Sequence, residues 1–222
     1  MTVEQVIELL KKAADPKIVE GLAHYGSKPE QALGISMPTL RNMAKEIGRD
    51  HELALALWQS GFHEARILAS MVDEPKKVTS QQMDDWVNDF DSWDVCDQVC
   101  GNLFNKTPYA HQKASEWCHR EPEFVRRAGF SMMAYIAVHD KKAPDEVFMP
   151  FFPLIKQYAT DERNFVKKAV NWALRQIGKR NSHLRTVALQ WAEEINAIDS
   201  KSARWIAKDA IRELQAKAQS SK

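Results

Sequence analysis

The stretch RNFVKKAVNWALRQIGKR, residues 163–180, shows one helical period from end to end. At about 100° per residue, its apolar side chains fall on a single stripe, as in an amphipathic helix. The members of that stripe are Val166, Ala169, Val170, Ala173, Leu174 and Ile177. Lys168, Trp172, Arg175 and Lys179 fall within about 60° of one another on the opposite face. The pattern predicts a helix that buries one face and turns an indole, bracketed by three cations, toward an anionic partner such as nucleic acid.

Helical periodicity continues along the rest of the chain, and no convincing alternating strand appears. Glycine and proline fall mostly between the periodic stretches. We expect helices near residues 2–14, 16–25, 37–48, 51–59, 62–72, 79–90, 92–106, 110–119, 121–139, 144–159, 161–180, 182–197 and 200–217.

These helices recur in similar units. Phe124-Val-Arg-Arg-Ala128 echoes Phe165-Val-Lys-Lys-Ala169 at a spacing of 41, and Ala65-Arg66 and Ala203-Arg204 open comparable helices. A period near 40 built of helix pairs is typical of HEAT-like repeats. The sequence therefore predicts an all-α, HEAT-like helical-repeat solenoid with a concave basic surface made by the second helices. We expect a single domain over residues 1–217 and a polar tail at 218–222.

Composition narrows the class of protein. With 222 residues, 44% hydrophobic and 27% charged, the chain resembles a soluble globular protein and has no apolar run of about 20 residues that would span a membrane. The N-terminal residues predict no secretory signal. An odd set of three cysteines favours a reducing compartment, hence a cytoplasmic protein. Cys96 and Cys100 lie one turn apart, and we interpret them as buried small residues rather than metal ligands.

Charge is unevenly distributed although the net charge is only +1. Residues 1–110 hold 11 Lys and Arg against 17 Asp and Glu, whereas residues 111–222 hold 20 against 13. Residues 163–185 contain seven basic residues and no acidic one. A solvated helix face usually carries both signs, so this run favours a functional basic patch over the alternative of a merely solvated face.

Two further segments carry residues suited to a binding site. Trp93 and Asp97 lie four positions apart and share a helix face, where a ring and a carboxylate can attract one cation together. The apolar stripe of the same helix lies about 100° or more from Trp93 and consists of Val95, Cys96, Val99 and Leu103. The alternative is a core-edge tryptophan with a solvated aspartate. Arg127 should point away from its apolar stripe beside the small Ser131 and Ala134, which suits phosphate recognition; the alternative is a surface salt bridge to Glu123.

Trp172 also has a structural alternative, which is packing against a neighbouring repeat. The histidines are scattered and form no visible set of metal ligands, and the sequence lacks a phosphate-binding glycine loop, a dinucleotide-binding fingerprint and a nucleophile elbow.

The segments SWDVCD (92–97), FVRRA (124–128) and VKKAVNWALR (166–175) resemble the AlkD family of HEAT-like-repeat DNA glycosylases for alkylated purines. The resemblance runs from about Tyr25 to Arg212. It implies that Asp97 is the catalytic carboxylate and that Trp93 and Trp172 contact the damaged nucleotide.

The same resemblance implies DNA contacts. Arg127 matches an arginine near the backbone of the lesion, and Tyr25 is similar to a tyrosine that some members place near the site. Lys168, Arg175 and Lys179 look like phosphate contacts by their position on the helix.

The implied activity is that of a monofunctional glycosylase, a monomer acting on double-stranded DNA that contains N3- or N7-alkylated purines. Members of the family are thought to leave the base stacked rather than flip it, and the chemistry requires no metal or cofactor. Two other classes remain open: a non-catalytic nucleic-acid-binding solenoid that recognises altered DNA structure, and a protein-interaction scaffold.

Overall fold

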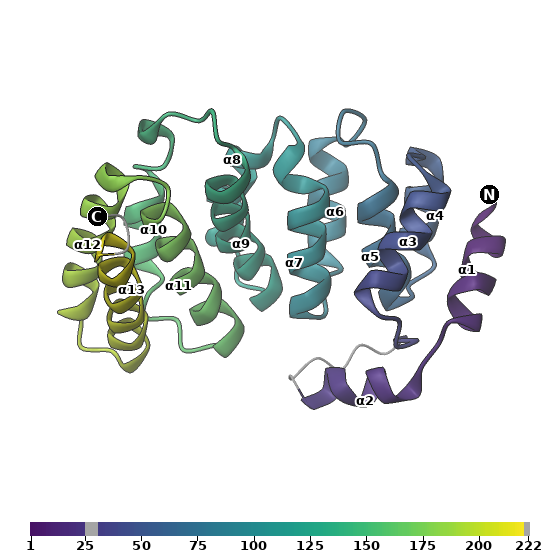
Figure 1. The fold of residues 1–222 in the computed structure, drawn as a ribbon, viewed down its shortest axis with the longest axis horizontal. Helices are drawn as coiled ribbons and strands as arrows, with labels where there is room; N and C mark the ends of the chain where they lie inside the picture. Colours follow the sequence, from purple (N-terminus) through teal and green to yellow (C-terminus); the bar gives the residue numbers. More distant parts are fainter. Residues whose placement is uncertain (25–30, 220–222) are drawn as a thin grey trace. The chain divides into compact units, whose positions relative to one another are not determined.

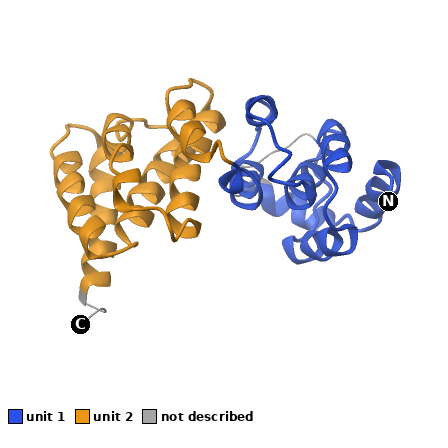
Figure 2. Cartoon of the chain, turned by 90° about the horizontal axis from the view of Figure 1, so that it is seen from above, with its two compact units in different colours: residues 1–107 blue, residues 108–222 orange. Residues whose placement is uncertain are grey.

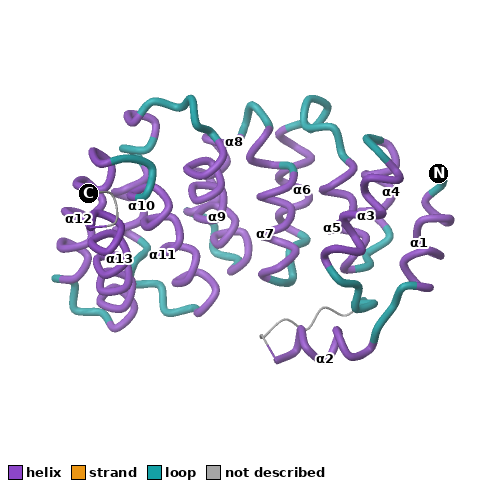
Figure 3. The backbone as a smooth tube through the Cα atoms, in the orientation of Figure 1, coloured by secondary structure: helices purple, strands orange, loops and turns teal. Residues whose placement is uncertain are grey.

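A computed structural model describes residues 1–24 and 31–219. These residues form thirteen α-helices and two short 3-10 helices, and no strand occurs among them (Figures 1 and 3). The helices are α1 (Val3–Lys12), α2 (Pro16–His24), α3 (Met37–Ile47), α4 (His51–Gln59), α5 (His63–Val72), α6 (Ser80–Asn88), α7 (Trp93–Asn102), α8 (Ala110–Cys118), α9 (Glu123–His139), α10 (Phe151–Gln157), α11 (Asn164–Gly178), α12 (Ser182–Asn196) and α13 (Lys201–Gln219), with η1 (Phe104–Lys106) and η2 (Asp145–Val147) between them. The predicted all-α class is confirmed.

The chain divides into two compact units, residues 1–107 and 108–222 (Figure 2). The expectation of a single domain over residues 1–217 stays a prediction. Within the described parts, no helix has the length and apolar character needed to cross a membrane.

The second unit shows the repeat in its contacts. Its helices alternate so that α9, α11 and α13 pack against one another in succession, each beside its own partner helix. Phe124 and Phe165, the two phenylalanines matched at a spacing of 41, lie with ring centroids 5.5 Å apart. The side-chain amide of Asn171 on α11 donates to the carbonyl of Ile206 on α13 at 3.2 Å. Equivalent positions of successive repeats therefore touch, as the sequence repeat predicts.

The first unit follows the same rule with different side chains. Helix α5 packs between α3 and α7. Trp58 of α4 and Trp86 of α6 stack with ring centroids 4.0 Å apart and nearly parallel planes. Both indoles are almost fully buried, so they join consecutive repeats through an apolar contact.

The structure corrects two of the predicted helices. Residues 144–159 do not form a single helix: η2 ends at Val147 and α10 begins only at Phe151. Pro150 lies between them, and the residue before a proline is disfavoured in the helical region, while proline itself lacks the N–H that would continue the ladder. The predicted helix 92–106 also ends early, at Asn102, and continues as η1.

One glycine marks the closest approach of two helices. A Cβ placed on Gly129 of α9 would lie 2.7 Å from the backbone nitrogen of Cys118 at the end of α8. Any side chain at this position would push the two helices apart.

Candidate nucleic-acid interface

Helix α7 presents Trp93 and Asp97 together. Its other side is fully buried through Val95, Cys96 and Val99, whereas Trp93 and Asp97 are only partly buried. The prediction that these two side chains share a face outside the apolar stripe is therefore confirmed. Cys96 and Cys100 are buried, as expected for small core residues, and so is Cys118, whose pKa is raised by burial.

The first turn of α7 is tied to α5. His63 Nε2 and Asp94 Oδ2 are 2.8 Å apart, one residue beyond Trp93. Burial alone would lower the pKa of His63, but the hydrogen bond and charge of Asp94, with Glu64 and Asp91 nearby, raise it above its ordinary value. Burial alone would raise the pKa of Asp94, but His63 outweighs it and lowers that pKa. The pair therefore favours an imidazolium–carboxylate bond that fixes the start of the helix carrying Trp93 and Asp97.

Glu64, the next residue of α5, holds a second segment of the same unit. Its carboxylate is 2% exposed and accepts from the backbone N–H groups of Leu33, Gly34 and Ile35 at 2.9, 2.6 and 3.2 Å. Gly34 has φ +79°, a conformation that glycine adopts without strain. Consecutive residues of α5 thus anchor both α7 and residues 33–35. Tyr25 lies outside the described residues, so its predicted contact stays a prediction.

Helix α11 places Trp172 between burial and exposure. The predicted apolar stripe of α11 is fully buried, and Trp172 lies off it, partly exposed. Its ring meets Tyr135 of α9 edge-on, with centroids 4.9 Å apart. When the side-chain amide of Gln176 is oriented so that its hydrogen-bonding groups are satisfied, its oxygen accepts from Trp172 Nε1 at 3.0 Å. Trp172 therefore packs against the preceding repeat, which was the structural alternative. Part of its indole is nevertheless exposed, and these contacts fix the orientation of the ring.

The basic side of α11 meets acids from α13. Glu213 accepts from Lys179 Nζ at 2.6 Å and from Arg175 Nη1, and Arg175 Nε lies 3.6 Å from Asp209. Burial alone would raise the pKa of Glu213, but these two cations lower it. Lys168 is exposed on the same helix. The single-sign run seen along the sequence is therefore partly neutralised by the next repeat.

The expected orientation of Arg127 is wrong. Arg127 is 6% exposed, and Ser131 and Ala134 beside it are fully buried. Its Nη1 donates to the carbonyl of Phe165 at 2.6 Å, at the start of α11. The helix is buried on this side because α11 packs along it. The role of Arg127 near a DNA backbone stays a prediction.

The sequence analysis missed the aromatic neighbours of Trp172. Tyr135 stacks on His139, one helical turn later, with ring centroids 5.9 Å apart. Tyr135 also contacts Trp172 edge-on. The four-residue spacing of Tyr135 and His139 was a signal for a shared face. The repeat spacing of 41 was a second signal, since it places Tyr135 one turn beyond Ser131, the counterpart of Trp172.

Six of the predicted site residues therefore fall into two groups, each within one unit. Trp93 and Asp97 lie together on α7, and Lys168, Trp172 and Arg175 lie on α11 with Lys179 at its C-terminal cap. Arg127 is buried on α9, and Tyr25 lies outside the described residues. Among the described residues, no group of three or more His, Cys, Asp or Glu could hold a metal ion.

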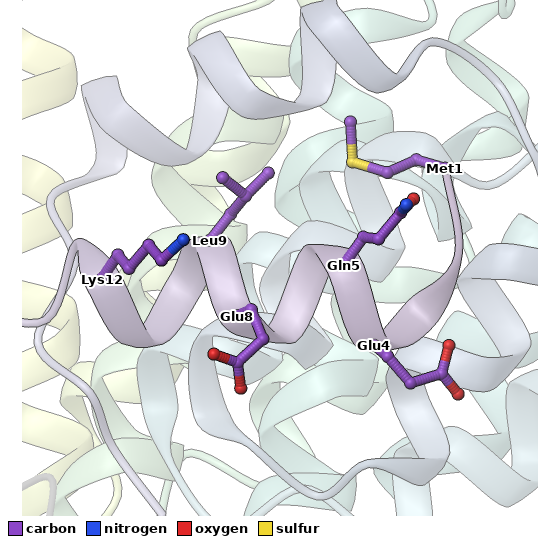
Figure 4. Close-up of a pocket in the computed structure, with 6 residues that line it drawn as sticks. All are labelled: Met1, Glu4, Gln5, Glu8, Leu9 and Lys12. Atoms are coloured by element: carbon purple, nitrogen blue, oxygen red, sulfur yellow. The ribbon is translucent and has the colours of Figure 1, made fainter.

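A pocket of about 540 Å³ lies elsewhere, along one face of α1 (Figure 4). Its lining consists of Glu4, Gln5, Glu8, Leu9 and Lys12 of this helix, with Met1 from the residues just before it. None of the predicted site residues belongs to it, and its acidic lining does not suit an anionic ligand.

Comparison with known proteins agrees with the helical-repeat fold. A sequence model described as "DNA alkylation repair enzyme" matches residues 6–214. The chain belongs to the DNA alkylation repair enzyme family. A solved structure described as "A new family of proteins related to the HEAT-like repeat DNA glycosylases with affinity for branched DNA structures" is similar at a TM-score of 0.80 and 19% identity, covering 96% of this chain and 95% of that one. No curated protein matches the sequence. This member of the DNA alkylation repair enzyme family thus has the predicted HEAT-like repeat fold.

Proposed function

We propose that this protein hydrolyses the N-glycosidic bond of N3- or N7-alkylated purines in double-stranded DNA. The observation that carries the proposal is that Trp93 and Asp97 are both partly exposed on one face of α7, in a chain of the DNA alkylation repair enzyme family. A carboxylate and an indole on one face are suited to a cationic nucleotide, because both attract positive charge.

The chemistry needs a carboxylate near the sugar. An alkylated purine carries a positive charge and leaves as a neutral base when its bond to C1′ breaks, so positive charge develops on the deoxyribose. Asp97 would stabilise that charge and orient a water molecule. The water oxygen bonds to C1′ and loses one proton, which leaves an abasic site and the free base.

In the second unit, Trp172 is the residue suited to a cationic base. Its indole is held by Tyr135 and by the Gln176 amide, so its exposed part needs little reordering on binding. Lys168, Arg175 and Lys179 would contact phosphates, with Arg175 and Lys179 exchanging Glu213 for DNA.

The test is release of base from alkylated duplex DNA by the wild-type protein and by Asp97→Asn. We expect the substitution to lower the rate by a factor of about 100 or more, because a preorganised charge is lost from the transition state. Asp85→Asn, at an exposed carboxylate on α6 of the same unit, is the matched control and should retain the wild-type rate. Background release by both the wild type and Asp97→Asn would remove the enzymatic proposal.

A second candidate is a non-catalytic protein that binds branched DNA. It is favoured by the similar structure, whose description names affinity for branched DNA, and by the partly exposed Trp172 on the helix that carries Lys168 and Arg175. It predicts salt-sensitive binding that is tighter for a DNA junction than for a linear duplex, without base release. Equal affinity for both forms would exclude it, and no salt-sensitive binding to either would leave the protein-interaction scaffold.

A further inference from the structure

Helix α13 repeats the polar pattern of α11. Lys201, Trp205, Lys208 and Arg212 stand at positions i, i+4, i+7 and i+11. Lys168, Trp172, Arg175 and Lys179 have the same spacing and the same order of one cation, one tryptophan and two further cations. At about 100° per residue, each set forms a single stripe along its helix. We call the set on α13 the α13 stripe.

The α13 stripe is more exposed than its counterpart. Trp205 is 42% exposed, the highest fraction among the tryptophans described, and Lys201, Lys208 and Arg212 are exposed beside it. The opposite side of α13 is fully buried through Ala203, Ile206, Ala207, Ala210 and Leu214. An exposed indole in a helix with a well-formed apolar side is not needed to complete the core.

Charge is segregated around α13. Its two acidic residues, Asp209 and Glu213, lie on the side that faces α11, where they pair with Arg175 and Lys179. Asp209 also pairs with Arg212, whose side chain remains 79% exposed. Lys167 of α11 adds a cation, with its Nζ 5.1 Å from the centre of the Trp205 ring. The surface around Trp205 is therefore cationic and aromatic together.

We propose that the α13 stripe binds a DNA strand, with its cations on consecutive phosphates and Trp205 stacked on an unpaired base. Lysines and an arginine spaced along a helix are suited to a phosphodiester backbone. An indole gains from stacking only where a base exposes its face, and a base inside an intact duplex does not. The partner is therefore DNA with a single-stranded segment, such as an overhang or the arm of a branch. The proposal takes DNA as the partner from the proposed function but does not require glycosylase activity.

Binding to a blunt duplex and to the same duplex with a single-stranded overhang, measured by fluorescence anisotropy, tests the stacking contact. Trp205→Leu should weaken overhang binding about fivefold or more and blunt-duplex binding less than twofold. Trp205→Phe should restore most of the affinity because it keeps an aromatic face. Equal losses on both DNAs, or no loss on either, would overturn the stacking contact.

The cations are tested by the salt dependence of binding. Lys201→Gln/Lys208→Gln should reduce the slope of log K against log salt by about 1.4 to 1.8, from two lost phosphate contacts. Lys45→Gln/Lys76→Gln removes the same charge from exposed positions of the first unit and should leave the slope near that of the wild type. A wild-type slope in the α13 variant, or equal losses in both variants, would overturn the proposal.

Two further readouts separate this proposal from others. Thermal unfolding distinguishes a structural role: if Lys167 and Trp205 only join α11 to α13, Trp205→Leu lowers the melting temperature and leaves overhang binding unchanged, which overturns the proposal. Base release distinguishes the proposed function: wild-type protein without base release but with Trp205-dependent overhang binding would refute glycosylase activity and retain the α13 stripe.

Discussion

Neutralising Glu213 should strengthen DNA binding rather than weaken it. Glu213 occupies Arg175 and Lys179, two cations that the sequence assigns to phosphate contacts. Glu213→Gln removes the competing negative charge while keeping a side chain of the same length. If phosphates and Glu213 compete for the same donors, the substitution makes at least one more phosphate contact available.

The size of the effect follows from counterion release. One added contact to duplex DNA steepens the slope of log K against log salt by about 0.9. If the two proteins bind equally at about 1 M salt, this steeper slope gives Glu213→Gln a binding constant about eightfold higher at about 0.1 M salt and about twofold higher at about 0.4 M. The cost to folding is small because the Glu213 side chain is 33% exposed, and exposed ion pairs contribute about 0–1 kcal/mol each.

Affinity for a blunt duplex, measured over a range of salt concentrations, is the assay. Glu193→Gln, at an exposed position on α12, makes the same change in net charge and is the matched control. The reasoning predicts a steeper slope for Glu213→Gln than for Glu193→Gln. An affinity for Glu213→Gln equal to that of the control, with parallel slopes, would show that Arg175 and Lys179 join α11 to α13 and do not bind DNA.

Three further predictions concern stability. The wild-type protein should lose unfolding free energy as the pH rises from 6.5 through the raised pKa of His63, because the charged hydrogen bond to Asp94, worth about 1.5–3 kcal/mol, is lost on deprotonation. His63→Gln should show a flatter dependence on pH, and equal pH profiles for both proteins would contradict this. Glu64→Gln should cost about 2–4 kcal/mol in urea unfolding, since an amide cannot accept from all three backbone donors, whereas the exposed Glu46→Gln should cost little. Gly129→Ala should cost about 1–3 kcal/mol by the same measurement, and an unchanged midpoint would mean that α8 and α9 separate freely.

The periodic stretches determined most of the fold in advance. The apolar stripe of α11 and the stripe of α7 are buried as predicted, because each is set by the period of one helix. The contact of Phe124 with Phe165 confirms the repeat. The break at Pro150 was missed because the apolar residues on both sides keep a helical period, although proline prevents the backbone from following it.

The site was harder to predict because its neighbours come from other repeats. A single-helix projection gives Arg127 an outward direction, but the start of α11 covers that direction and offers a carbonyl to the guanidinium. The same projection shows only basic residues on the polar face of α11, because the acid that pairs with Arg175, Glu213, lies 38 residues later in the sequence. Tyr135 was overlooked for the same reason. In a stack of helices, the charge on a surface depends on the side chains of two successive repeats, whereas the periodicity of one helix describes the side chains of that helix alone.

This dependence on two repeats makes the two basic stripes separable by experiment. On α13, the acids that face α11 partly neutralise that helix, and Asp209 also pairs with Arg212 of the α13 stripe, while Lys201 and Lys208 are exposed. Glu213→Gln should therefore raise affinity through α11, and Lys201→Gln/Lys208→Gln should lower it through the α13 stripe. If the stripes bind separate phosphates, the two free-energy changes add in the combined variant. A combined variant with the affinity of Lys201→Gln/Lys208→Gln alone would mean that the cations of α11 reach DNA only after the α13 stripe has bound it.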